Sequence, residues 1–137
     1  MRSILISCDG GARGNPGPAA IGAVISDATT DPPTVIQSIS ERIGVATNNV
    51  AEYRALVRAL EAAADLGARD VHIRADSQLL IRQLEGHYRV KNAGLRPWFE
   101  QARELLAPYD RVVLEHIPRA DNVDADALVN AALDATG

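Results

Sequence analysis

Apolar residues alternate with polar ones in several short stretches of the chain, which is the spacing of a half-buried β-strand. Three such stretches follow one another near the N-terminus, and two more are separated from them by helical patterns. The predicted strands cover residues 4–9, 20–26, 35–43, 70–76 and 111–117. The short connections between the first three strands predict an antiparallel meander.

Helical periodicity marks the segments between and after the later strands. The predicted helices cover residues 50–66, 78–84, 95–106 and 122–135. In the first of them, Tyr53, Leu56 and Leu60 form an apolar stripe opposite Arg54 and Arg58. A strand, this helix and a further strand make a βαβ unit, so we predict an α/β fold with a mixed sheet.

The last predicted helix covers residues 122–135. Its spacing predicts partial burial of Val123, Ala127, Ala131 and Leu133. Trp98, in the preceding helix, is more typical of helix packing than of base stacking.

The bulk composition is that of a soluble globular protein, with 47% hydrophobic and 23% charged residues in 137. This length predicts one domain, residues 1–137, whether it is a whole protein or a piece excised from a longer chain. Cys8 is the only cysteine, so no intrachain disulfide forms. No apolar run is long enough to span a bilayer and no signal-peptide pattern is present, so we expect a cytoplasmic protein without membrane contact.

The net charge of −4 argues against a protein that binds nucleic acid through overall electrostatic attraction. Basic residues nevertheless gather between Arg82 and Arg96, where the only lysine of the chain, Lys91, is found. A local positive surface is therefore compatible with an acidic protein.

The first strand ends, by pattern, at Asp9 and runs into a glycine-rich stretch through Gly17. Bare glycine backbone allows a ligand to approach closely, whereas an isolated Asp-Gly is usually an ordinary turn. The stretch matches neither the Walker phosphate loop nor the Rossmann glycine motif. A carboxylate on a strand beside bare backbone suggests a metal held near a phosphate.

Three more carboxylates stand at the ends of predicted elements, namely Glu52, Asp76 and Asp126. Acids near a helix start are also explained by the helix dipole, and Asp126 shares that explanation with Asp124. Carboxylates without cysteine or several histidines suit Mg²⁺ or Mn²⁺ rather than Zn²⁺. Spacing alone does not show that the four acids meet.

Four motifs in order resemble ribonuclease H of type 1. They are Asp-Gly-Gly from Asp9, Thr-Asn-Asn-x-x-Glu from Thr47, Asp-Ser-Gln from Asp76 and Asn-x-x-Ala-Asp-x-Leu from Asn122. Together they cover nearly the whole chain. The resemblance implies a five-stranded mixed sheet, three strands antiparallel and two parallel, with helices packed around it.

The resemblance also implies an activity, namely endonucleolytic hydrolysis of the RNA strand of an RNA/DNA hybrid that leaves a 3′-hydroxyl and a 5′-phosphate. By motif position, the catalytic and metal-binding residues would be Asp9, Glu52, Asp76 and Asp126. They would hold two Mg²⁺ ions, or Mn²⁺ in their place, with Asp9 bridging both. Glu52 would also lie near the ribose 2′-hydroxyl, which distinguishes RNA from DNA.

The family also implies residues that contact the hybrid. The minor groove would meet Gly10, Gly11, Asn15, Asn48, Asn49 and Gln78. Thr47 matches a position that holds a DNA-strand phosphate. Lys91 and Asn92 resemble the branch of the family that lacks a long basic protrusion.

One departure from the family concerns the loop before the last helix. Many members carry there a histidine thought to assist product release, but residues 117–122 are too few to contain it, and His116 falls on the predicted strand. We hypothesise from position that Arg119 acts near the scissile phosphate instead.

Two other functions remain open from the sequence. One is a DNA-directed nuclease, since the same fold class hosts several nucleases. The other is a catalytically silent module that only binds hybrids, against which the four intact acids argue.

Overall fold

A computed structural model describes residues 2–135 and contains one five-stranded sheet in the order β3-β2-β1-β4-β5. The strands are β1 (Ser3–Ala12), β2 (Gly17–Asp27), β3 (Thr34–Ala46), β4 (Asp70–Ala75) and β5 (Arg111–His116). The first three pair antiparallel, while β4 is parallel to β1 and β5 is parallel to β4. This confirms the predicted mixed sheet.

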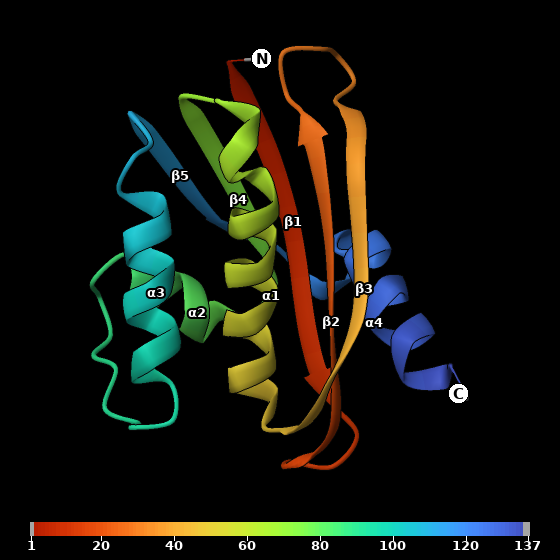
Figure 1. Cartoon of the computed structure of the whole chain (residues 1–137). Coiled ribbons are helices and arrows are strands. Elements are labelled where there is room, and N and C mark those ends of the chain that lie inside the picture. The colour runs from red at the N-terminus through yellow and green to blue at the C-terminus, as the bar shows by residue number, and fades with distance from the viewer. Residues whose placement is uncertain (1, 136–137) are drawn as a thin grey trace.

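Helices cover both faces of the sheet (Figure 1). The α-helices are α1 (Asn48–Ala63), α2 (Gln78–Leu84), α3 (Arg96–Leu106) and α4 (Val123–Asp134), with short 3₁₀ helices at Ala64–Leu66 and Arg119–Asp121. The first three lie on one face, and α4 lies alone on the other. None of the helices in residues 2–135 is both long and apolar enough to cross a membrane.

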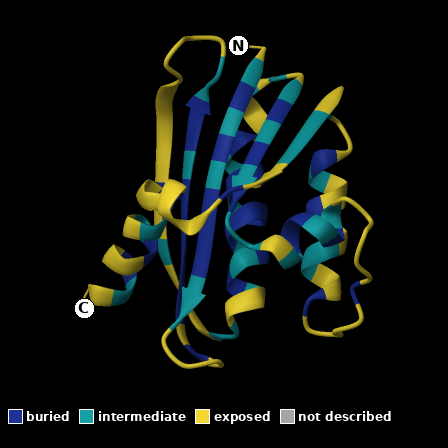
Figure 2. Ribbon diagram, turned by 180° about the vertical axis from the view of Figure 1, so that it is seen from behind, coloured by how far each residue is buried: buried dark blue, intermediate teal, exposed yellow. Residues whose placement is uncertain are grey.

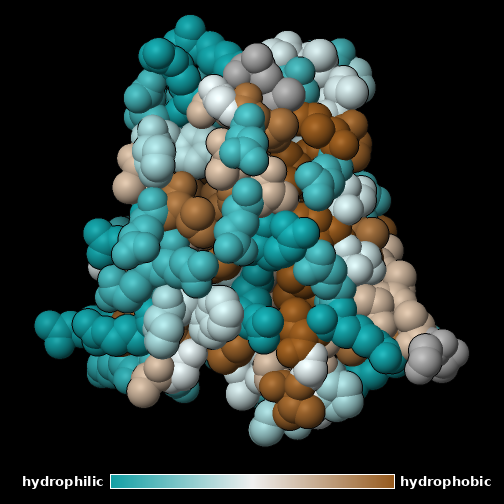
Figure 3. Space-filling view, viewed as in Figure 1, coloured by the Kyte–Doolittle hydropathy of each residue, from teal (hydrophilic) through white to brown (hydrophobic). Residues whose placement is uncertain are grey.

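The main core lies between the sheet and the α1 side. Alternate residues of β1, among them Ile4, Ile6 and Cys8, are fully buried there, and Figure 2 shows the resulting stripes along the strands. On the side of the molecule that carries α1, α2 and α3, hydrophilic side chains cover most of the outer surface (Figure 3). Because side chains alternate across a strand, Asp9 projects to the face that carries α4.

The prediction that the first strand ends at Asp9 is wrong. The strand continues through Gly10 and Gly11 to Ala12, which stay in register with β2 as far as Ala19. Pairing with β2 fixes these glycines in extended backbone, so the turn comes later, between the end of β1 and Gly17. Asp9 is therefore held inside the sheet rather than at its edge.

The buried face of α4 differs from the predicted buried face. Val123, Ala127 and Ala131 are exposed, and Leu133 is half-buried as expected. The side chains that α4 buries are Ala125, Val129 and Ala132. The prediction of Val123, Ala127 and Ala131 as buried residues is wrong, because alanines occur on every side of this helix and contacts elsewhere determine its rotation.

Candidate active site

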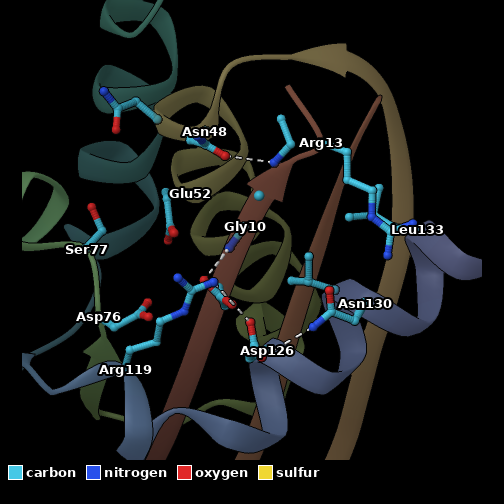
Figure 4. Close-up of a pocket in the computed structure, with 15 residues that line it drawn as sticks. Gly10, Arg13, Asn48, Glu52, Asp76, Ser77, Arg119, Asp126, Asn130 and Leu133 are labelled. Carbon is cyan, nitrogen blue, oxygen red and sulfur yellow. Dashed lines mark hydrogen bonds and ion pairs between the residues drawn. The ribbon is translucent and has the colours of Figure 1, made fainter. Parts of the chain in front are cut away.

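A pocket of about 420 Å³ opens where β1, α1, β4 and α4 come together (Figure 4). Its lining includes all four predicted acids, Asp9, Glu52, Asp76 and Asp126. Asp9 comes from the middle of the sheet, Glu52 from the first turns of α1, and Asp76 from just after β4. The fold thus brings together acids that lie up to 117 residues apart in the chain.

Three of these acids form a tight cluster. Asp9, Glu52 and Asp76 each offer a carboxylate oxygen, and these oxygens lie within 4.8 Å of one another. Asp126 is not part of this set, although it faces Asp9 across the pocket. Asp9 is the acid that interacts with each of the other three.

The absence of a side chain at Gly10 allows α1 to pack close to β1, so that Glu52 lies near Asp9. A Cβ atom at Gly10 would lie 2.3 Å from the carbonyl carbon and oxygen of Ala51, and 2.6 Å from the backbone nitrogen of Glu52. These distances are far below van der Waals contact, so any side chain would push α1 away from β1. The bare backbone of Gly10 is what lets the helix lie against the strand at Glu52.

Gly22 has the same function on the opposite face. It pairs with Asp9 in the register between β1 and β2. A Cβ atom there would lie 2.3 Å from the carbonyl oxygen of Ala125 and 2.9 Å from the Cβ of Leu128. Close packing of α4 on this glycine brings Asp126 to the pocket.

Asp126 is half-buried and has two partners on the rim of the pocket. Asn130, one turn later on α4, donates to its Oδ2 at 3.3 Å. The guanidinium of Arg119 lies 3.7 Å from its Oδ1. Asp124, which the sequence could not separate from Asp126, is exposed and does not line the pocket.

Burial and mutual repulsion disfavour full ionisation of the cluster. Burial, followed by the charge of Asp76, raises the pKa of Asp9 to about 7. Burial and the charge of Asp9 raise the pKa of Glu52 as well. The pKa of the adjacent Cys8 thiol is raised chiefly by its own burial. A bound cation would remove this repulsion and favour the ionised carboxylates.

The donor set fits a hard divalent cation. Oxygen is the only ligand type that the clustered acids offer, as Mg²⁺ and Mn²⁺ prefer. Glu52 Oε2 is buried and has no hydrogen-bond partner among the described residues. A buried carboxylate oxygen without a partner is costly, and a metal ion would satisfy it.

Asn122 connects the strand that carries Asp9 to Asp76 through its side-chain amide. Its place in a sequence motif did not reveal this role. It is buried, and its Nδ2 donates to the carbonyl of Cys8 at 2.9 Å and lies 3.4 Å from Asp76 Oδ1. The sequence also missed Arg13, Ser77 and Asn130 as pocket residues. For Asn130, its position four residues after Asp126 was the available signal.

The predicted substrate-binding residues fall into two groups. Those that line the pocket are Gly10, Gly11, Asn48, Asn49 and Arg119. Those that do not line it are Asn15, Thr47, Gln78, Lys91 and Asn92.

Two residues of the second group have structural roles beside the pocket. Asn15 accepts a hydrogen bond from the backbone nitrogen of Asn48 at 3.0 Å. Thr47 is the N-cap of α1, and its hydroxyl accepts from Val50 at 3.2 Å.

Lys91 lines a separate surface hollow. Its neighbours there are Arg89, Val90, Arg96 and Phe99. The hollow lies on the connection between α2 and α3, which contains no helix between residues 85 and 95. A basic surface therefore exists apart from the acidic pocket.

Comparison with known proteins gives a consistent result. The family described as reverse transcriptase-like matches residues 7–132. A ribonuclease HI of Halobacterium salinarum is 48% identical over 92% of this chain and 62% of that protein. The bifunctional protein Rv2228c of Mycobacterium tuberculosis is 45% identical over 96% of this chain. The chain spans only 36% of that relative.

Solved structures agree with the sequence matches. The N-terminal RNase H domain of Rv2228c has a TM-score of 0.91 at 44% identity, covering 96% of this chain and 99% of that one. LC11-RNase H1, solved in complex with an RNA/DNA hybrid, has a TM-score of 0.88 at 44% identity, covering 96% of each chain. The fold and the site thus define an α/β domain that has a pocket of clustered acids. The chain belongs to the reverse transcriptase-like family, in its type 1 ribonuclease H branch.

Proposed function

We propose that this chain is an endonuclease that hydrolyses the RNA strand of RNA/DNA hybrids in a reaction that depends on divalent metal ions. The observation that carries the proposal is the convergence of Asp9, Glu52 and Asp76 within 4.8 Å in an open pocket. A similar protein, LC11-RNase H1, has been solved with a hybrid bound, which supports this substrate class.

We propose two Mg²⁺ ions as the cofactor, with Mn²⁺ as a substitute. Asp9, Glu52 and Asp76 would hold one ion, and Asp9 with Asp126 would hold the other, since Asp9 interacts with all three acids. When bound, the ions supply positive charge for the attacking water and the departing 3′ oxygen. The products would carry a 3′-hydroxyl and a 5′-phosphate.

The residues beside the acids are suited to contact the hybrid. Gly10 and Gly11 both line the pocket, and the half-buried Gly11 offers backbone without a side chain to an approaching duplex. The side-chain oxygen of Asn48 accepts from Ala12 at 2.8 Å, which leaves its amide nitrogen free to donate to a base or sugar. Asn49 is exposed on the same rim. Glu52 would meet the ribose 2′-hydroxyl and so select RNA.

Residues outside the pocket would extend this surface. The hydroxyl of Thr47 accepts from Val50 and keeps its own hydrogen available for a phosphate of the DNA strand. Asn15, Gln78 and Asn92 would add polar contacts, and Lys91 would add a positive charge in its separate hollow. The longer relative described as bifunctional supports the idea that such a domain works fused to another one.

Arg119 would act next to the scissile phosphate. Its side chain is 81% exposed, and its guanidinium lies 3.7 Å from Asp126. We expect Arg119→Ala to slow multiple turnover more than a single turnover, because the residue would replace the missing loop histidine in product release. Unchanged rates in both assays would remove Arg119 from the mechanism.

A cleavage assay with separate labels on the two strands tests the proposed function. We expect cuts in the RNA strand of the hybrid, in the presence of Mg²⁺ and not of EDTA, with 3′-hydroxyl and 5′-phosphate ends. A matched DNA duplex should stay intact, and equal cutting of that duplex would indicate a DNA-directed nuclease. Tight hybrid binding without any cleavage would indicate a silent binding module.

A further inference from the structure

The end of the pocket farthest from Arg119 contains a second arginine that the proposed mechanism does not use. Arg13 follows the last residue of β1 and lines the pocket together with Asn130 and Leu133. Figure 4 shows its side chain running beside α4 near Leu133, while Arg119 lies at the end with the acids. Its guanidinium pairs with the carboxylate of Asp134.

This ion pair is not a structural necessity. The Arg13 side chain is 51% exposed and that of Asp134 is 66% exposed, and pairs in such positions contribute little to stability. Asp134 is also the last residue of α4, where the helix dipole disfavours a negative charge. The pair therefore holds a guanidinium at the pocket while leaving it free to exchange partners.

The charges around the pocket have a simple arrangement. Among the described lining residues, Arg13 and Arg119 are the only cations; Arg119 lies beside Asp126, and Arg13 lies farther along α4, near Leu133. The guanidinium nitrogens of arginine that bind phosphate groups also bind carboxylates, such as that of Asp134. A polyanion that lies across the acids and continues along α4 would meet Arg119 at the acids and Arg13 farther along.

We propose that Arg13 binds a backbone phosphate of the hybrid away from the scissile phosphate, and that Asp134 competes with this phosphate for the guanidinium. The proposal rests on the proposed function. Asp134 lies eight positions after Asp126 on α4, about 12 Å along the helix axis. At about 3.4 Å per nucleotide along a duplex, this corresponds to roughly three to four nucleotides from the cleavage site.

The first test compares two pairs of variants in hybrid binding. Arg13→Gln and Asp134→Asn alter the pocket pair, while Arg69→Gln and Asp110→Asn alter a matched exposed pair at the far end of β4. Affinity is measured by fluorescence anisotropy in EDTA, where no cleavage is expected, at several salt concentrations. Melting temperatures confirm that the four variants fold alike.

We expect Arg13→Gln to raise the Kd several-fold and to lower the salt slope by about 0.7–0.9, the effect of one lost phosphate contact. Asp134→Asn should lower the Kd, because the competing carboxylate is gone. The KM for cleavage should follow the Kd, with kcat unchanged. The variants at Arg69 and Asp110 should bind like the wild type.

The second test identifies the phosphate. Hybrids with one neutral methylphosphonate at each position in turn are bound to wild type and to Arg13→Gln. One substitution, three to four nucleotides from the cut, should weaken the wild type and have no further effect on the variant. Fully additive losses at every position would overturn the proposal.

The two proposals fail in different ways. If the wild type cleaves hybrids but Arg13→Gln binds them like Arg69→Gln, only the role of Arg13 is refuted. If the wild type neither binds nor cleaves hybrids, the proposed function fails and this inference fails with it.

Discussion

The side-chain amide of Asn122 donates a hydrogen bond to the backbone carbonyl of Cys8 at 2.9 Å, which ties the start of α4 to the residue before Asp9. The same nitrogen lies 3.4 Å from Asp76 Oδ1. Asn122 is 2% exposed, so these contacts are shielded from water. One buried amide therefore links β1, Asp76 and the helix that carries Asp126.

Replacing this amide should change metal binding as well as stability. Asn122→Ala leaves the buried Cys8 carbonyl without a partner, which costs about 1–3 kcal/mol. Because supporting hydrogen bonds orient metal ligands, the Mg²⁺ concentration for half-maximal cleavage should rise about 10-fold or more. Chemical denaturation and Mg²⁺ titrations measure the two effects, with the exposed Gln37→Ala as control. A stability loss with unchanged Mg²⁺ dependence would show that Asn122 is only structural.

The two glycines after Asp9 should differ sharply when replaced by alanine. Gly10→Ala places a Cβ 2.3 Å from the backbone of Ala51, so we expect an overpacking cost of about 1–3 kcal/mol in unfolding free energy. Gly11→Ala meets Val129 Cγ1 at 3.8 Å and Asn48 Oδ1 at 4.0 Å, which are ordinary contacts, and should fold as stably as the wild type. Equal melting temperatures for the two variants would contradict the packing of α1 on β1 described above.

The antiparallel meander and the mixed sheet were predictable, because alternation marks the strands and the connections between them are short or helical. The strand boundary at Asp9 was not, because glycines have weak preferences and only pairing with β2 extends β1 to Ala12. The rotation of α4 was also hidden, because its alanines give a weak pattern and the close approach at Gly22 determines which side is buried. Long-range contacts of this kind have no local sequence signal.

The candidate acids were predictable for a related reason. Asp9, Glu52 and Asp76 each belong to a motif on a recognisable element, so the family resemblance identified them as candidate metal ligands. Asn122 was seen only as part of a motif, because its role depends on the carbonyl of Cys8, 114 residues away. Arg13 was missed because its place at the pocket depends on where α4 ends.

Asp9 should give the metal-free domain a characteristic pH dependence. Its pKa is raised from 3.8 to about 7 in the folded state, so the folded protein holds this proton more tightly than the unfolded chain. Protonation of Asp9 therefore stabilises the folded state. This contribution is fully present below about pH 4 and is lost as the pH rises through about 7. At pH 8 in EDTA, we therefore expect Asp9→Asn to be more stable than wild type, by up to about 4 kcal/mol.

Divalent metal should reverse that order. Wild type gains stability on binding Mg²⁺, whereas Asp9→Asn has lost a central ligand and gains less. Thermal denaturation at pH 5 and pH 8, with EDTA or Mg²⁺, checks both expectations. A wild type that is at least as stable as Asp9→Asn at pH 8 in EDTA would argue against the raised pKa.

Asp126 and its neighbour Asp124 offer a matched comparison on one helix turn. Both variants to asparagine remove one negative charge near the start of α4, so their effects on stability should be similar, about 0.3–1 kcal/mol. Only Asp126 lines the pocket. We expect Asp126→Asn to lower hybrid cleavage by about 100-fold, and Asp124→Asn to change it less than about 2-fold. Equal activities would exclude Asp126 from the metal site.

The central claim is that three converging carboxylates hold the metal ions that cleave RNA. Cleavage of a hybrid with a labelled RNA strand, by wild type and Asp9→Asn side by side at saturating Mg²⁺, tests it most directly. We expect rapid RNA cleavage by wild type and a loss of at least about 1000-fold in the variant, because several kcal/mol of transition-state stabilisation depend on the metal. Comparable cleavage by both proteins would contradict the claim.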